Sequence, residues 1–114
     1  MFTRIVWGKI LPGKWDEYET AYKAAIKARG AVDGLVVQWL ARDQKDLDAG
    51  YSVSVWETQD AMNAYVGSAQ HKAMTNPLKP FFVNQYTATH CDVRHFERPL
   101  PKRIPGDMDI YHTN

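Results

Sequence analysis

The hydrophobic period of this chain changes just after Trp56, and that change constrains the fold more than any other feature of the sequence. From Tyr51 to Trp56 the side chains alternate as in a β-strand, while beyond Thr58 they recur at helical spacing. The strand presents two sets of side chains to opposite faces: Val53 and Val55, and Ser52, Ser54 and Trp56. A strand must therefore lead directly into a helix, with Trp56 at the junction.

The helical region that follows is predicted to have two parts. Thr58 is a suitable cap for the first helix, and Gly67 interrupts it. Ser68 is a suitable cap for a second short helix, which places His71 in its first turn. Two side chains of the first helix share a face at i, i+3 spacing: Met62 and Tyr65. A strand-end Trp, a helical Tyr and a His are therefore expected to converge on one cavity.

The remaining patterns predict three further strands and one long helix. Strands are expected at residues 2–11, 34–42 and 85–96, and a helix at residues 14–29. An apolar stripe marks the buried face of that helix: Trp15, Tyr18, Tyr22, Ala25 and Ile26. The order strand, helix, strand, strand, helix, strand predicts an α+β fold. It is the ferredoxin-like βαββαβ plait, a four-stranded antiparallel sheet with its helices on one face.

The second strand predicts how the other face of this sheet is covered. Strict alternation places Leu35, Val37 and Trp39 on one face, with Val36 and Leu40 on the other and Gln38 between them. Helices cover only one face, and a second copy of the chain is the simplest cover for the other. We therefore expect a homodimer formed through the sheet.

Composition narrows the classes of function. The chain has 114 residues and a formal net charge of +1, which is typical of one compact domain without a general attraction to nucleic acid or to an anionic membrane. It has one cysteine, Cys91, and its longest apolar runs fall short of the ~20 residues of a membrane span. These features favour a cytoplasmic protein whose partners are a small molecule and its own copy.

The end of the chain differs in composition from the rest. Beyond Glu97 the sequence has three prolines and no hydrophobic period. We expect a domain at residues 1–97 and an extended arm at residues 98–114, which lies either on a neighbouring subunit or free as a frayed terminus. A metal site in the preceding strand is not expected. Cys91 and His95 share a strand face but stand roughly 13 Å apart, and His90 points to the opposite face.

Four local motifs, taken together, resemble those of a known family. They are G-K-x-x-P-G at residues 8–13, W-x-T-x-x-A at residues 56–61, S-x-x-H at residues 68–71 and an apolar anchor at residues 78–82. Their order and spacing resemble the antibiotic biosynthesis monooxygenase family of dimeric α+β barrels, over roughly residues 2–97. The resemblance implies a homodimeric barrel. It also implies an oxidoreductase that converts an aromatic phenol, hydroquinone or anthrone with molecular oxygen and without flavin, haem or metal.

The same resemblance implies roles for particular residues. Trp56 would border the substrate with its indole N–H as a donor, Tyr65 would hydrogen-bond a substrate oxygen, and His71 would take the proton as general base. The alternatives are that Trp56 and Tyr65 only pack in the core and that His71 only satisfies local backbone groups. The resemblance and the strand pattern together give the expected substrate-binding residues: Ser52, Ser54, Arg4 and Met62.

Two other functions compete with this one. Some relatives degrade haem, and there a histidine in the region of His71 ligates the iron; haem binding or degradation is therefore the alternative cofactor hypothesis. Haem degradation also needs an asparagine on the first strand, where this chain has Val6 and no asparagine. The third possibility is a non-catalytic dimeric module that binds a small ligand.

Overall fold

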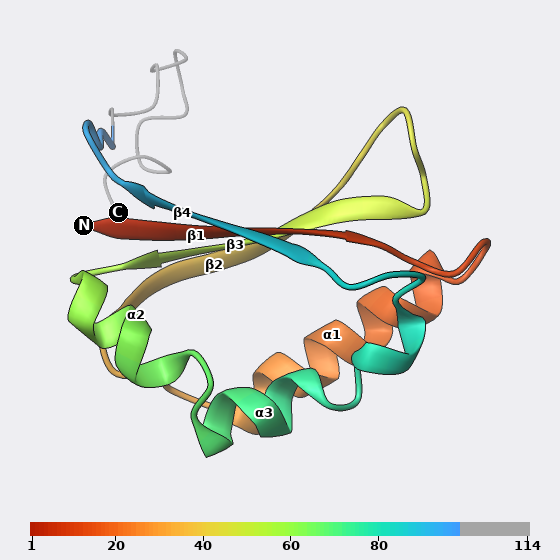
Figure 1. Cartoon of the computed structure of the whole chain (residues 1–114), viewed down its shortest axis with the longest axis horizontal. Helices are drawn as coiled ribbons and strands as arrows, with labels where there is room; N and C mark the ends of the chain where they lie inside the picture. Colours follow the sequence, from red (N-terminus) through yellow and green to blue (C-terminus); the bar gives the residue numbers. More distant parts are fainter. Residues whose placement is uncertain (99–114) are drawn as a thin grey trace, which may run out of the picture.

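A single antiparallel sheet carries all the helices of the domain on one face. The structure is a computed structural model that describes residues 1–98. Its strands are β1 (Phe2–Lys9), β2 (Leu35–Arg42), β3 (Ala49–Trp56) and β4 (Thr87–Asp92), in the order β2-β3-β1-β4. The helices are α1 (Trp15–Arg29), α2 (Gln59–Tyr65), α3 (Ala69–Thr75) and the 3₁₀ turn η1 (Lys79–Phe81). Figure 1 shows the strands as one layer with the helices beneath it.

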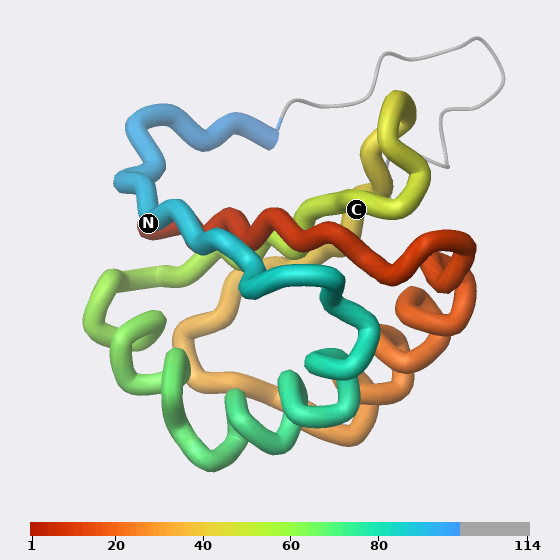
Figure 2. Tube along the Cα trace, turned by 45° about the vertical axis from the view of Figure 1, so that its right-hand side comes forward, coloured from red at the N-terminus to blue at the C-terminus, as the bar shows by residue number. Residues whose placement is uncertain are grey.

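This architecture confirms the predicted ferredoxin-like α+β fold. Helix α1 buries Trp15, Tyr18, Tyr22 and Ala25, and Ile26 packs against the same cluster, so the stripe read from the sequence faces the sheet. In Figure 2 the helices follow one another along the side of the molecule opposite β1 and β4. Because β1 and β4 are antiparallel partners, the start of the chain lies beside the end of β4. The predicted arm at residues 98–114 lies, from residue 99 on, outside the described residues.

The sheet departs from prediction at β2. A β-bulge between Leu35 and Val37 breaks the strict alternation. Leu35 therefore pairs with Trp56 and packs in the cluster on the helix face, while Val36 is exposed. Beyond the bulge, Gln38 pairs with Ser54 and so faces the helices. The last strand is also shorter than the expected residues 85–96.

Two glycines in neighbouring strands make room for the rings beneath the sheet. Gly8 of β1 and Gly50 of β3 are direct cross-strand partners. A Cβ on Gly8 would meet the ring of Phe82, and a Cβ on Gly50 would meet the ring of Trp15 and the carbonyl oxygen of Ala41. Gly8, the first glycine of the G-K-x-x-P-G motif, thus lets an aromatic ring pack directly on the strand backbone.

We predict that Gly8→Ala and Gly50→Ala each lower the free energy of unfolding by about 1–3 kcal/mol, because the added methyl group overpacks an aromatic contact. Urea unfolding measures the change. Lys27→Ala on the exposed side of α1 is the control, with an expected change within about 0.5 kcal/mol. Alanine variants as stable as the parent protein would show that these glycines are not required for packing.

Candidate active-site cavity

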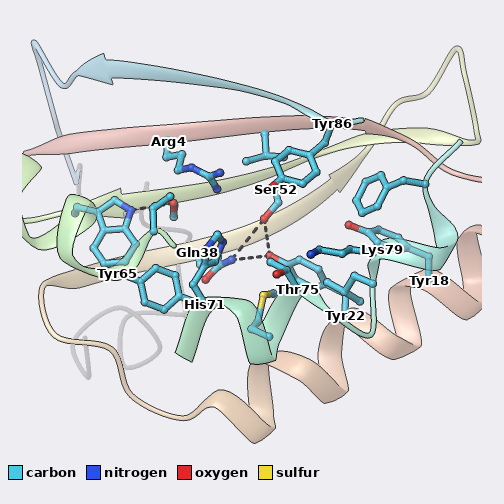
Figure 3. Close-up of a pocket in the computed structure, with 17 residues that line it drawn as sticks. Arg4, Tyr18, Tyr22, Gln38, Ser52, Tyr65, His71, Thr75, Lys79 and Tyr86 are labelled. Carbon is cyan, nitrogen blue, oxygen red and sulfur yellow. Dashed lines mark hydrogen bonds between the residues drawn. The ribbon is translucent and has the colours of Figure 1, made fainter. Parts of the chain in front are cut away.

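The hydrophobic core has two clusters, and a cavity of about 70 Å³ lies between them. Trp56 and Tyr65 of one cluster and Tyr18 and Met74 of the other contribute to its wall, together with His71. At about 10–15 Å³ per water, the cavity holds several water molecules, so the three residues of the predicted site surround space as well as packing on one another. Figure 3 shows the side chains of Tyr65 and His71 under the sheet.

Trp56, Tyr65 and His71 form a short row of tilted, contacting rings along one wall. The ring centroids of Trp56 and Tyr65 are 5.3 Å apart, and those of Tyr65 and His71 are 5.0 Å apart. The indole Nε1–H of Trp56 donates to Oγ of Ser54 at 2.9 Å, so this N–H is already bonded within the wall. Trp56 therefore contributes an apolar surface, and Ser54 fixes the orientation of its ring.

The other predicted substrate-binding residues divide into two groups. Arg4 and Ser52 line the cavity from β1 and β3. Met62 does not line it; its side chain is fully buried in the cluster of Phe2, Trp56 and Tyr65. The structure thus places Met62 behind the wall of the cavity.

His71 occupies the first turn of α3, and the local backbone determines its tautomer. Oγ of Ser68 caps the helix by accepting from the backbone N–H of His71, as predicted. The backbone N–H of Gly67 donates to Nδ1 of His71 at 3.0 Å. A backbone N–H can only donate, so Nδ1 is unprotonated and the neutral ring carries its hydrogen on Nε2. In this tautomer the remaining ring nitrogen is a hydrogen-bond donor.

The surroundings of His71 keep it neutral. Burial lowers the pKa of His71 below its ordinary value of 6.5, and the nearby positive charges of Arg4, Arg29 and Lys79 lower the pKa further. Protonation would also place a hydrogen on Nδ1, where the Gly67 N–H already points. The imidazole is therefore neutral at physiological pH.

A chain of hydrogen bonds beside the cavity runs from Arg29 to Ser52. Arg29 donates to Oε1 of Gln38 at 2.8 Å, so the amide NH₂ of Gln38 faces Tyr22 and donates to its hydroxyl at 2.9 Å. The hydroxyls of Tyr22 and Ser52 lie 2.7 Å apart. Their mutual bond uses one of their two hydrogens, so one hydroxyl hydrogen remains for an acceptor in the cavity. Burial raises the pKa of Tyr22, which keeps it a neutral phenol.

Sequence reasoning missed several of these residues as parts of the site. Tyr22 belongs to the apolar stripe that predicts the buried face of α1, and Arg29 is simply the last residue of the predicted helix at residues 14–29. Gln38 did carry a signal, because it is polar on a strand that is otherwise apolar. Nothing in the local pattern marks Lys79, which reaches the cavity from the η1 turn.

Fold and cavity together define a ferredoxin-like α+β protein with a cavity between sheet and helices. The family model described as antibiotic biosynthesis monooxygenase matches residues 1–76 of this sequence. The chain belongs to the antibiotic biosynthesis monooxygenase family. No curated protein matches it.

Solved structures support the same fold. Proteins from Nitrosomonas europaea, Bordetella bronchiseptica and Caulobacter crescentus, all named for this family, superpose with TM-scores of 0.72, 0.72 and 0.69. Their sequence identities to this chain are 10%, 19% and 20%. The matches cover 83%, 81% and 82% of this chain and 100%, 95% and 90% of theirs. At these identities the likeness establishes the fold alone.

The environment of His71 predicts a pH dependence of stability. Between the lowered folded-state pKa and about 6.5, the unfolded chain binds more protons at His71 than the folded protein does, so stability falls as pH falls through this range. We predict that His71→Asn, which keeps an acceptor for Gly67 but does not titrate, flattens the change in melting temperature between about pH 7.5 and about pH 5.5. Thermal melts of both proteins measure it. The other three histidines are common to both and serve as the internal control. Parallel profiles would contradict the assigned neutral state.

Proposed function

We propose that this chain is an oxygenase that converts a small phenol, hydroquinone or anthrone with molecular oxygen and without flavin, haem or metal. The observation that carries the proposal is the polarity of the cavity. Its walls are largely aromatic, and its polar groups are mainly hydrogen-bond donors and cations. Among the described residues that line it, none is Asp or Glu. Such a site favours an aromatic ring bearing an anionic oxygen.

The proposed chemistry begins with ionisation of the substrate. Arg4 and the Nε2–H of His71 stabilise the substrate anion, so the phenol or enol binds deprotonated. The electron-rich anion passes one electron to O₂, and the radical pair combines to a peroxide at carbon. For an anthrone, loss of water then converts the CH₂ group to C=O. One oxygen atom enters the product and the other leaves as water, which carries away the two hydrogens of the CH₂ group.

In this proposal His71 acts as a donor, in contrast to the general base expected from the sequence. The base role needs an unprotonated Nε2 facing the substrate, and therefore a hydrogen on Nδ1, where Gly67 already donates. Tyr65 retains the expected role of polar anchor. Its hydroxyl oxygen accepts from Arg29 at 3.4 Å, which leaves its own hydrogen for a substrate oxygen. Trp56 forms the wall against which the ring stacks.

The residues present do not fit haem. A histidine that ligates iron through one nitrogen usually donates a hydrogen from the other, whereas Nδ1 of His71 accepts one. The non-catalytic module shares the same cavity, and oxygen uptake separates it from an oxygenase.

Two variants of His71 separate a donor from a base. His71→Gln places an amide N–H near the position of Nε2, while the shorter side chain of His71→Asn keeps an acceptor for Gly67 but places no N–H at the position of Nε2. We predict that the glutamine variant keeps turnover within about tenfold of the parent and that the asparagine variant loses about 10²–10³-fold, as expected for a lost oxyanion donor. Oxygen uptake with a panel of hydroquinones and anthrones measures both.

Neither variant supplies a base, so equally large losses in both would contradict the donor role. Lys72→Ala, at an exposed position of α3 outside the cavity wall, serves as a control for general disturbance of the helix. If the parent protein consumes no oxygen with any member of the panel, the oxygenase proposal fails and the ligand-binding module replaces it.

We further propose that a second copy of the chain covers the open face of the sheet. Val37, Trp39 and Tyr51 lie on the face away from the helices and are 40%, 46% and 39% exposed. Such a group of large apolar side chains is unusual on the surface of a monomer. A dimer through this face would make the closed α+β barrel that the resemblance implies.

We predict that Trp39→Glu converts the protein to a monomer, because it places a charge in the centre of the apolar contact. Size-exclusion chromatography with light scattering gives the mass. Lys72→Glu on the exposed side of α3 is the matched control and should leave the mass of a dimer unchanged. A parent protein with the mass of one chain would refute the proposal.

A further inference from the structure

More positive side chains surround the cavity than the proposed oxidation of a single phenol requires. Arg4 and Lys79 line the cavity. Arg29 lies behind its wall, where it donates hydrogen bonds to Gln38 and to the hydroxyl of Tyr65. Within residues 1–98, none of these three cations is in a salt bridge, whereas Lys9, Lys14 and Lys23 are. The formal net charge of the whole chain is only +1, so the group of cations at the cavity is a local feature and does not follow from the overall charge.

Arg4 has an unused donor inside the protein. Its Nε is buried and has no hydrogen-bond partner among the described residues. A buried guanidinium N–H without an acceptor is costly and marks a place where an acceptor from a ligand fits. In Figure 3 the guanidinium of Arg4 extends from β1 toward the space between Ser52 and His71.

Lys79 reaches the same cavity from a different direction. It begins η1, and its side chain is exposed, so it stands where the cavity meets solvent. Figure 3 shows its amine on the side of Tyr18 and Tyr22, whereas Arg4 lies toward Tyr65. The cavity is thus lined by one cation from β1 and by another from η1.

We propose that the substrate carries a carboxylate in addition to the hydroxyl that is oxidised, so that its class is a hydroxylated aromatic acid. This inference rests on the proposed function and specifies the substrate class of the same site. Arg4 and His71 bind the phenolic oxygen, and Lys79 binds the carboxylate. A neutral phenol supplies one anionic oxygen, whereas two separated cations match two. Lys79 is a single positive charge at its position, and one such charge fits a carboxylate better than a doubly charged phosphate.

The experiment compares two hydroquinones that differ only in this group. The probes are 2,5-dihydroxybenzoate and its neutral amide, 2,5-dihydroxybenzamide. Calorimetric titration without oxygen measures binding separately from oxidation. We expect the parent protein to bind the acid at least about tenfold more tightly than the amide, and the preference to shrink between about 0.05 and about 0.5 M NaCl.

Three variants locate the preference. Lys79→Gln, at an exposed position, should reduce it about 3–5-fold, and Lys72→Gln, an exposed lysine of α3 outside the cavity wall, should leave it unchanged. Arg4→Gln should weaken binding of both probes about 30-fold or more, because it removes the buried donor. If Arg4→Gln does not fold, the comparison of Lys79→Gln with Lys72→Gln decides by itself.

Equal binding of acid and amide by the parent protein would overturn this inference, as would an equal preference in Lys79→Gln and Lys72→Gln. Oxygen uptake then tests the proposed function separately. Selective binding of the acid without its oxidation would retain the inference and refute the oxygenase. Oxidation of the amide with the same Kd and rate as the acid would retain the oxygenase and refute the inference.

Discussion

Between α2 and α3 the chain turns at Gly67, and this turn directs a backbone N–H at Nδ1 of His71. The chemistry of the cavity depends on that hydrogen bond. It excludes a hydrogen from Nδ1, and so makes Nε2 a donor and removes the basic nitrogen from the side that a substrate can reach. Ser68 supports the arrangement by capping α3 through the N–H of the same residue. Two short-range backbone contacts thus turn a residue suited to general base catalysis into a neutral donor beside cations.

The positive charges around His71 act in the same direction as its tautomer. Arg4, Arg29 and Lys79 each oppose protonation of the imidazole, and burial opposes it most. Their mutual repulsion favours binding of an anion, since a ligand that brings negative charge relieves it. Arg29 also has a structural function, because it fixes the amide of Gln38 and through it the hydroxyls of Tyr22 and Ser52. The network joins Tyr22 of one core cluster to Tyr65 of the other.

Local patterns in the sequence predicted the parts of this structure that depend on near neighbours. The caps at Thr58 and Ser68, the apolar stripe of α1 and the order of the elements each follow from residues a few positions apart. The rest depends on contacts across the fold. The bond from Gln38 to Tyr22 joins residues 16 positions apart, and the pair of Tyr22 and Ser52 spans 30. The bulge at Val36 turns Gln38 toward Tyr22 and Ser52. An alternating sequence pattern does not indicate which residue of a strand will form a bulge.

The hydrogen-bond donors that line the cavity limit how strongly it can stabilise a substrate anion. The pKa of a phenol is ordinarily ~10, and it must fall to about 7 for the phenol to ionise at pH 7. Such a change corresponds to about 4 kcal/mol of stabilisation of the anion. One hydrogen bond to a charged group contributes about 1.5–3 kcal/mol, so two such bonds suffice. Arg4 and His71 supply two donors of this kind, in a site without a carboxylate to compete for them. Much stronger stabilisation would slow the reaction, because an anion that is held more tightly gives up an electron to oxygen less readily. The combination of one half-buried cation and one neutral donor therefore suits the proposed reaction, in which the anion must form and still remain reactive.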